Sequence, residues 1–200
     1  MNFLAHAYLS FDDPEVLAGN LFSDFVKGRR QYDFPPGIRR GILLHRMIDG
    51  FTDDHPRVHE AKEIFRPLYR LYSGAFIDVA FDHFLANDEN EFTDASLLAF
   101  SQKVYRLTEQ NTTWFPAKFA GMFPYMKRQN WLYDYRKRQG IFNSFEGLVR
   151  RAAYMSESLP AVQLMLDNYD YLRACYGKFW PELKAFAEVQ YHQLSEKENP

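Results

Sequence analysis

The sequence predicts an all-α protein, and three observations carry this prediction. Apolar residues recur at helical spacing along most of the chain. Alternating apolar and polar runs joined by turn dipeptides, which would indicate strands, do not repeat. Proline and capping residues divide the chain into segments of helix length. Because the 200 residues contain no Gly/Ser linker and no internal repeat, we expect a single domain over residues 1–200, folded as a helical bundle.

The first half of the chain offers clear helix starts. Asp13 precedes Pro14, which fits an N-cap followed by a proline in the first turn. Pro35-Pro36 breaks the chain before a second helix, residues 52–56 cap a third, and Ser73-Gly74 precedes a fourth. The helices expected here span residues 14–25, 36–51, 56–72 and 75–87.

The second half keeps the helical spacing with weaker boundaries. Apolar periodicity resumes after Thr93-Asp94. The helices expected here span residues 94–111, 113–125, 127–138, 143–157 and 160–191. The polar tail, residues 194–200, is expected to fray.

Composition narrows the class of protein. Hydrophobic residues make up 46% of the chain and aromatic residues 18%, which is typical of a globular protein with a sizeable core. The net charge of −2 provides no overall field that would attract nucleic acid or anionic lipid, and no run of 18 apolar residues indicates a membrane span. The single Cys175 excludes an intramolecular disulfide. We therefore expect a cytoplasmic protein with neither a nucleic-acid nor a membrane partner.

The segment 76–86 places ionisable groups in a helix that otherwise has the composition of a buried one. Asp78 and Asp82 are one turn apart, and His83 follows Asp82, among Phe, Ile, Val and Leu. An unpaired carboxylate is costly to bury, so such a group normally pairs, takes up a proton or binds a metal. The segment therefore predicts either a buried hydrogen-bond network or a functional site.

Two further segments place His or Asp beside apolar residues. His45 and Asp49 are four residues apart and share one helix face, and Asp24 lies between aromatic residues. One such pair is more often a hydrogen bond or an ion pair than a ligand pair, but three such segments make a metal or acid–base site equally compatible with the residues. Imidazole and carboxylate donors without thiolate suit Mn²⁺, Fe²⁺, Mg²⁺ or Zn²⁺, and the carboxylate content favours Mn²⁺ or Mg²⁺.

Several motifs occur in the order typical of a known family. They are Asn2-Phe-Leu-Ala-His6, Gly19-Asn20, Asp24-Phe-Val-Lys-Gly28, Gly41-Ile42, His45-Arg46, Ile48-Asp49, Phe51-Thr52-Asp53, Asp78, Asp82-His83-Phe84-Leu85, Trp131, Tyr135-Arg136 and Gly140. With these motifs and its length, the chain resembles the acyl carrier protein phosphodiesterase family over nearly its whole span. The most specific motifs lie in residues 1–86.

The resemblance implies a fold, a reaction and a cofactor. Members of the family are similar to the HD phosphohydrolases, all-helical enzymes in which clustered His and Asp residues hold divalent ions. They hydrolyse the phosphodiester that joins 4′-phosphopantetheine to a serine of acyl carrier protein, which releases apo carrier and 4′-phosphopantetheine. The implied activating ion is Mn²⁺, with Mg²⁺ and Fe²⁺ as alternatives. Asp82-His83 reverses the His-Asp order that names the HD group, but agrees with the pattern of the family itself.

The resemblance also implies a set of site residues. The expected metal ligands are His6, Asp24, His45, Asp49, Asp82 and His83. The residues expected to act in catalysis are Asp24, Lys27, Arg46 and Asp78, the last as a further ligand or as support for one. A bound metal would lower the pKa of a coordinated water and stabilise charge on the phosphoryl oxygens, to which Arg46 or Lys27 would add.

An acidic carrier protein would need a basic surface on this chain. The residues expected to bind it form a local basic and aromatic segment, Lys127, Arg128, Trp131, Arg136 and Arg138. The other interpretation of this segment is a solvated helix face with its aromatic residues packed inward. Two other functions also remain open: an HD-like phosphohydrolase that acts on a small nucleotide or phosphate ester, and a non-catalytic helical scaffold.

Overall fold

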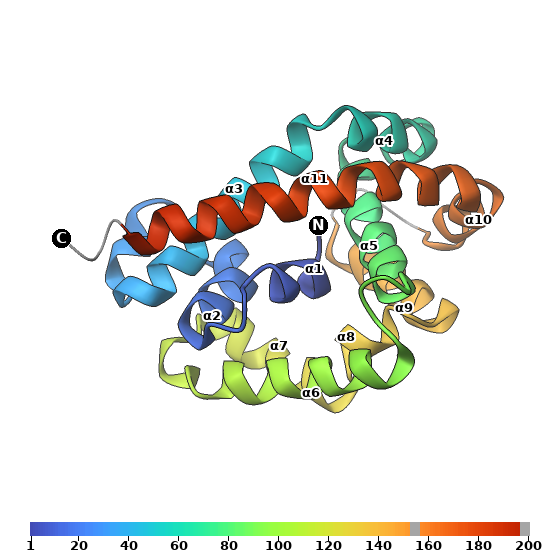
Figure 1. Cartoon of the computed structure of the whole chain (residues 1–200). Coiled ribbons are helices and arrows are strands. Elements are labelled where there is room, and N and C mark those ends of the chain that lie inside the picture. Colours follow the sequence, from blue (N-terminus) through green and yellow to red (C-terminus); the bar gives the residue numbers. More distant parts are fainter. Residues whose placement is uncertain (153–156, 197–200) are drawn as a thin grey trace.

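The computed structural model describes residues 1–152 and 157–196, and every regular element within them is a helix (Figure 1). The α-helices are α1 (Phe3–Tyr8), α2 (Pro14–Phe22), α3 (Pro36–Asp54), α4 (Pro56–Tyr69), α5 (Ser73–Ala86), α6 (Asp94–Glu109), α7 (Ala117–Arg128), α8 (Trp131–Asp134), α9 (Arg138–Arg151), α10 (Leu159–Asp167) and α11 (Tyr169–Glu196). Short 3-10 helices lie between them at η1 (Ser23–Phe25), η2 (Gly28–Asp33), η3 (Arg70–Tyr72) and η4 (Thr112–Trp114). The prediction of an all-α protein is confirmed.

Helices α2, α3 and α4 begin where capping residues and prolines predict them, whereas α5 begins at Ser73, two residues earlier than predicted and without a side-chain cap. The side chain of Asp13 accepts hydrogen bonds from the backbone N–H groups of Glu15 and Val16 at the start of α2. Helices α3 and α4 both begin at a proline, which fits the first turn because no partner is needed there for its missing N–H group. Helix α2 ends at Phe22, three residues earlier than predicted, because the chain tightens into η1.

Helix α1 is absent from the sequence prediction. Its six residues make less than two turns, which is too short for apolar periodicity to be read. A helix of this length is not stable alone, so its stability comes from packing. It packs against α2 and α5, and Leu4, Ala5 and Ala7 are buried.

The second half of the chain departs further from the prediction. The expected helix over 127–138 is instead the end of α7 and the short α8, separated by Asn130 in a left-handed conformation with φ of 49°. The expected helix over 160–191 is divided into α10 and α11 at Asn168, whose side chain donates to the carbonyl of Leu164. Helix α7 starts four residues later than predicted. Residues 153–156 of the expected helix 143–157, and 197–200 of the tail, lie outside the described residues.

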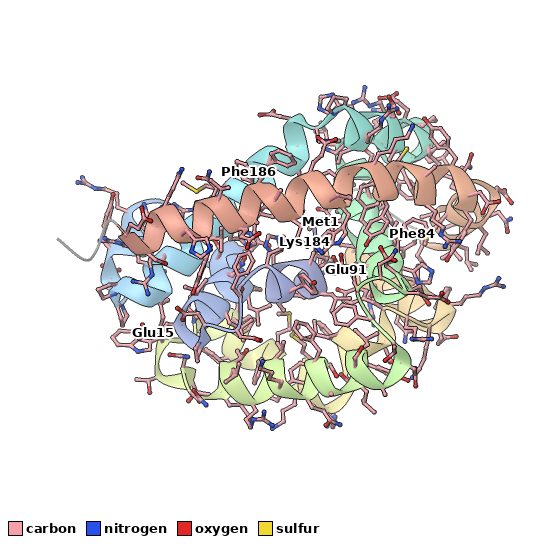
Figure 2. All side chains as sticks on the ribbon, viewed as in Figure 1. Met1, Glu15, Phe84, Glu91, Lys184 and Phe186 are labelled. Carbon is pink, nitrogen blue, oxygen red and sulfur yellow. The ribbon has the colours of Figure 1, made fainter. Side chains whose placement is uncertain are left out.

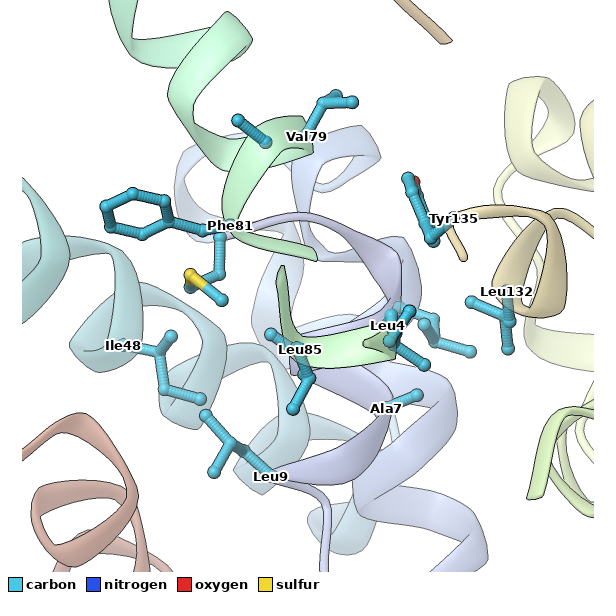
Figure 3. Packing of buried hydrophobic residues seen from close by; sticks show 14 of the residues in the cluster. Leu4, Ala7, Leu9, Ile48, Val79, Phe81, Leu85, Leu132 and Tyr135 are labelled. Carbon is cyan, nitrogen blue, oxygen red and sulfur yellow. The ribbon is translucent and has the colours of Figure 1, made fainter. Parts of the chain in front are cut away.

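The other helices surround α1. Helix α11 runs along α3, α4 and α5, while α6 packs on α2 and α8 at the opposite edge of the molecule (Figure 1). Figure 3 shows Leu4 and Ala7 of α1 among Leu85 of α5, Ile48 of α3 and Leu132 of α8. A polar side chain on α1 is therefore placed inside the core. None of the described helices is both long and apolar enough to cross a membrane.

Two glycines let α2 and α3 approach closely. A Cβ atom on Gly19 would lie 2.0 Å from the carbonyl oxygen of Ile38, and one on Gly41 would lie 2.1 Å from the carbonyl oxygen of Val16. Any larger residue at either position would push the two helices apart. The close approach brings Asn20 of α2 between α1 and α3.

Candidate metal centre

Three side chains from α1 and α3 converge inside the molecule. His6 Nε2 lies 3.2 Å from Asp49 Oδ1, and His45 Nε2 lies 3.0 Å from Asp49 Oδ2. The two imidazole rings are stacked, with centroids 4.0 Å apart. One nitrogen or oxygen atom from each of the three residues lies within 4.8 Å of the others. We refer to His6, His45 and Asp49 as the His/Asp cluster.

Asn20 fixes the orientation of both imidazole rings. Its side-chain NH₂ group donates to the carbonyl of His6 at 2.9 Å and to Ser10 Oγ at 3.0 Å, so its side-chain oxygen faces His6 Nδ1 at 2.8 Å. The backbone carbonyl of Asn20 lies 2.8 Å from His45 Nδ1. Both Nδ1 atoms therefore donate. In the neutral rings this leaves a lone pair on each Nε2, on the side of Asp49.

The two Nε2 atoms are buried and make no hydrogen bond among the described residues. Asp49 lies close to both, but a nitrogen lone pair that faces a carboxylate is repelled by it. Buried polar atoms in native proteins nearly always have a partner. Two such imidazole nitrogens beside a carboxylate form a donor set that fits a divalent metal ion.

The pKa shifts within the His/Asp cluster indicate that one of its two imidazoles is protonated at neutral pH. Burial and the neighbouring His45 ring lower the pKa of His6 to about 4. Burial would also lower the pKa of His45, but Asp24 and Asp49 outweigh it and raise that pKa to about 9. For Asp49, burial is outweighed by the two imidazoles, which lower its pKa. At neutral pH the metal-free cluster therefore holds one extra proton, on His45 Nε2, which faces the carboxylates of Asp49 and Asp24. His6 is neutral and its Nε2 lone pair has no donor; a metal ion bound at the cluster would take the place of the His45 proton.

Asp24, in η1, extends the cluster toward solvent. Its Oδ1 atom lies 3.3 Å from His45 Nε2, and the contact lowers the pKa of the carboxyl. The Asp24 side chain is 76% exposed and that of Asp49 is 40% exposed, whereas the two imidazoles are buried. The cluster is therefore closed on its imidazole side and open on its carboxylate side, as a site for an external substrate requires.

The two predicted catalytic cations have different surroundings. Arg46 donates to Gln31 Oε1 at 2.9 Å and to the carbonyl of Val26 at 3.2 Å. It thereby ties the segment that follows Asp24 to α3. Lys27 is exposed, and it lies three residues after Asp24. Arg46 is thus placed to position a segment, while Lys27 remains available at the surface.

Asp82 binds the first residues of the chain in the structure. Its carboxylate accepts hydrogen bonds from the backbone N–H groups of Asn2, Leu4 and Ala5 at 3.1, 2.7 and 3.4 Å. These groups have no partner within the helix at its N-terminus. Burial raises the pKa of Asp82 to about 7, although the Met1 amine and these N–H groups act in the opposite direction. Because both oxygens are used, we leave Asp82 out of the proposed ligand set and assign it the anchoring of α1.

Asp78 and His83 also have partners within the chain. Asp78 Oδ1 lies 2.9 Å from the amine of Met1, and burial raises its pKa against the effect of that amine. His83 Nδ1 lies 2.7 Å from the carbonyl of Tyr135, to which it donates, and His83 Nε2 lies 2.9 Å from the Tyr169 hydroxyl. Burial lowers the pKa of His83. The structure therefore uses His83 to join α5 to α11, and we leave it and Asp78 out of the ligand set.

Two of the residues expected to bind the carrier protein form ion pairs with carboxylates of this chain. Lys127 Nζ lies 2.6 Å from Glu109 Oε1, and Arg136 Nε lies 3.4 Å from Asp94 Oδ1. Their charges are partly compensated, which weakens their attraction for an acidic protein.

The other three residues of that segment are placed differently. Arg128 lies over the ring of Tyr125 at 5.0 Å, and Arg138 is exposed at the start of α9. Trp131 packs against Phe3 of α1, with ring centroids 6.5 Å apart. The two arginines remain candidates for a docking surface, whereas Trp131 faces the neighbouring helix.

Two groups that shape the site had no predicted role. Asn20 orients both imidazoles, and its only local signal is a polar residue after a glycine in an otherwise apolar helix. The amine of Met1 binds Asp78, a contact that no side-chain pattern could predict. Both act through helices that are distant in sequence.

The fold and the cluster together define a class of protein. It is an all-α protein in which two imidazoles and a carboxylate, held by α1, α2 and α3, form a half-open site whose donors fit a divalent cation. Such sites are typical of metal-dependent hydrolases.

Comparisons with known proteins identify the family. The acyl carrier protein phosphodiesterase family matches residues 1–183. The acyl carrier protein phosphodiesterase of Klebsiella pneumoniae is 33% identical over 189 residues, which cover 94% of this chain and 98% of that protein. Those of Photorhabdus laumondii and Escherichia coli O139:H28 are 32% and 34% identical, over 94% of this chain and 96% and 97% of their own lengths.

The chain therefore belongs to the acyl carrier protein phosphodiesterase family and is a hydrolase. The resemblance seen in its motifs is confirmed. No solved structure matches the chain. Its similarity to the HD phosphohydrolase fold accordingly stays a prediction.

Proposed function

We propose that the protein is a metal-dependent phosphodiesterase that hydrolyses the bond between 4′-phosphopantetheine and the serine of holo-acyl carrier protein. The observation that carries the metal dependence is the convergence of the buried Nε2 atoms of His6 and His45 on Asp49, where the lone pair of the neutral His6 has no donor. The family supports the reaction, because its members are named for it. The products are apo carrier protein and free 4′-phosphopantetheine.

The His/Asp cluster is the proposed metal site, and Asp24 completes it on the side of His45. A divalent ion in such a site lowers the pKa of a bound water and neutralises charge on phosphoryl oxygens. Mixed imidazole and carboxylate donors suit Mn²⁺, with Mg²⁺ and Fe²⁺ as alternatives.

Other residues of the chain position these groups. Asn20 holds the protons of both imidazoles on Nδ1, away from the site. Asp82 fixes α1 and hence His6, while Arg46 fixes the segment that carries Asp24. Lys27, exposed beside that segment, is the proposed contact for a phosphoryl oxygen.

Arg128 and Arg138 are the proposed docking residues for the carrier protein. Among the described residues neither forms an ion pair, and both are exposed. An acidic partner would be attracted by these uncompensated charges. The single Cys175 is buried and suits a reducing cytoplasm, where we place the reaction.

The direct test of the function is incubation of the Mn²⁺-loaded protein with holo-carrier protein, followed by mass spectrometry. The carrier should lose the mass of its 4′-phosphopantetheine group, and free 4′-phosphopantetheine should appear. Chelation of the metal should stop both changes. An unchanged carrier, together with hydrolysis of a small nucleotide or phosphate ester, would favour the other phosphohydrolase function. A protein that binds no metal and hydrolyses neither substrate would be a scaffold.

The docking residues are tested by charge reversal. Arg128→Glu combined with Arg138→Glu should raise the KM for holo-carrier protein roughly tenfold and leave kcat unchanged, because only the encounter is altered. Lys178→Glu, at an exposed position of α11, is the matched control and should change neither constant. An unchanged KM in the double variant would show that Arg128 and Arg138 do not bind the carrier protein.

A further inference from the structure

A cavity of about 690 Å³ lies between the start of α1, α8 and α9. Its volume falls in the range of roughly 300 to 1,000 Å³ that is typical of small-molecule sites. Asn2 and Phe3 form its wall on the side of α1. Phe3 precedes His6 by three residues, so one turn of helix separates the cavity from the His/Asp cluster.

One part of the cavity lining is aromatic. Phe3, Trp131 and Tyr135 all border it, and the rings of Phe3 and Trp131 are in tilted contact. Gly147 of α9, where a Cβ atom would meet nothing within 4 Å, leaves space on the opposite wall. This part of the cavity suits methyl and methylene groups.

Another part of the lining offers amide donors. The side-chain oxygens of Asn2, Gln129 and Asn143 are each hydrogen-bonded within the chain, at 2.9, 2.8 and 2.9 Å. Among the described residues, their NH₂ groups make no hydrogen bond. These three groups are available to the carbonyl oxygens of a ligand.

The charges of the lining cancel. Asp134 and Glu146 carry two negative charges, while Arg150 and Arg151 carry two positive ones. Arg150 Nη2 also lies 3.8 Å from Glu146 Oε2. A balanced lining attracts neither an acidic protein surface nor a strongly charged small molecule, so it fits an uncharged, amide-containing chain.

We propose that this cavity binds the pantetheine arm of the substrate while the phosphodiester lies at the His/Asp cluster. The proposal rests on the proposed function. The arm is a flexible, uncharged chain of amide, methylene and methyl groups, which matches the aromatic rings and the three NH₂ donors. With the scissile bond at the cluster, the arm extends past the first turn of α1 and into the cavity. The carrier protein stays outside.

Gly147 provides a variant that fills the cavity. It lies within α9, and a Cβ atom built on it would meet nothing within 4 Å, so Gly147→Phe places a ring in the cavity without a backbone clash. Gly177→Phe is the matched control, because Gly177 is helical, exposed and equally unobstructed in α11. The manganese content of each folded variant shows whether the His/Asp cluster is intact.

Two readouts test the proposal. Gly147→Phe should lower kcat/KM for holo-carrier protein at least tenfold, or about 1.4 kcal/mol, with its manganese content unchanged, while Gly177→Phe should match the wild type. Pantetheine, which carries no phosphate, should quench the fluorescence of the wild type but not of Gly147→Phe, and Trp131→Phe should remove most of that signal.

The outcomes separate this proposal from the proposed function. Wild-type kcat/KM in Gly147→Phe with holo-carrier protein would overturn the arm site and leave the phosphodiesterase function standing. If the wild type leaves holo-carrier protein intact, the function fails, and the pantetheine titration alone decides the cavity. Quenching of the wild type that Gly147→Phe abolishes would still support a pantetheine site in the cavity. No quenching of the wild type would overturn that site.

Discussion

Two carboxylate clusters lie inside this apolar protein, and they differ in whether their polar atoms have partners. Glu91, only 8% exposed, accepts hydrogen bonds from the Tyr8 hydroxyl at 2.5 Å, Trp180 Nε1 at 2.9 Å and Lys184 Nζ at 2.5 Å. Figure 2 shows Glu91 next to Lys184 of α11. At Asp49, by contrast, the neutral His6 presents an Nε2 lone pair to the carboxylate, and this atom has no hydrogen-bond partner among the described residues.

The difference separates structural from functional polar groups. Every partner of Glu91 donates to its carboxylate, so the cluster is complete and holds α11 against the end of α1. In the His/Asp cluster both Nδ1 atoms donate to oxygens of Asn20, but the neutral His6 has only a lone pair on the side of Asp49. A buried group without a partner destabilises a fold unless a ligand binds it. We therefore attribute stability to the first cluster and metal binding to the second.

The largest expected effect comes from removing the charge of Asp49. Asp49→Asn should abolish binding of Mn²⁺ and lower kcat by about 10³-fold, or about 4 kcal/mol, because the metal is the proposed source of transition-state stabilisation. Asp49 is partly exposed, so the free energy of unfolding of the metal-free protein should change by no more than about 1 kcal/mol. Turnover, metal content and urea denaturation measure the three quantities. Normal turnover in this variant would contradict the assignment of the His/Asp cluster as the catalytic metal site.

The Glu91 cluster should behave in the opposite way. Glu91→Gln leaves Lys184 without its buried partner and should lower the free energy of unfolding by about 2 to 4 kcal/mol. The metal content per folded molecule should stay at the wild-type level. Glu89→Gln, at an exposed neighbouring position, should change stability by less than about 0.5 kcal/mol. Loss of metal binding in Glu91→Gln would show that the two clusters are not separable.

Asp82 should contribute both to the stability of the fold and to the metal site, because it anchors the helix that carries His6. Its variant should therefore lower the free energy of unfolding and the metal affinity together, by smaller amounts. In Asp82→Asn, one carboxylate oxygen becomes an NH₂ group that faces backbone N–H groups of α1. The free energy of unfolding should fall by about 1 to 3 kcal/mol. Since α1 carries His6, metal affinity measured by titration should weaken as well. A loss of stability with unchanged affinity would show that α1 keeps its position without this anchor.

The smallest effect per step is a dependence of metal affinity on pH, which amounts to about tenfold, or about 1.4 kcal/mol, for each pH unit. The carboxylates raise the pKa of His45 to about 9 in the metal-free protein, so below pH 9 a metal ion must displace that proton. The apparent Kd for Mn²⁺ should therefore rise about tenfold for each unit that pH falls from 9 to about 6. The pKa of His6, lowered to about 4, contributes nothing in this window. Calorimetry in two buffers should show about one proton released, and an affinity independent of pH would contradict the assigned charge state.

The fold could be predicted where the signals are local. Capping residues and prolines located the starts of α2, α3 and α4, because these signals act within the first turn of a helix. Helix α1 could not be predicted, since its six residues depend on packing for their stability. The boundary at Asn130 depends on one residue in a left-handed conformation, which the apolar pattern does not reveal.

The same distinction applies to the site. His45 and Asp49 share one helix face, so their spacing alone indicated that they act together. The burial of Asp82 and His83 was also predictable from their apolar neighbours. Their partners were not, because the N–H groups of α1 and the hydroxyl of Tyr169 come from elements far away in the sequence.

The most direct test of the central claim is a crystal structure of the protein soaked in Mn²⁺, with the ion located by its anomalous scattering. We predict a peak within coordination distance of His6 Nε2, His45 Nε2 and a carboxylate oxygen of Asp49. A peak at Asp82 and His83 instead, or no peak at saturating Mn²⁺, would contradict the account.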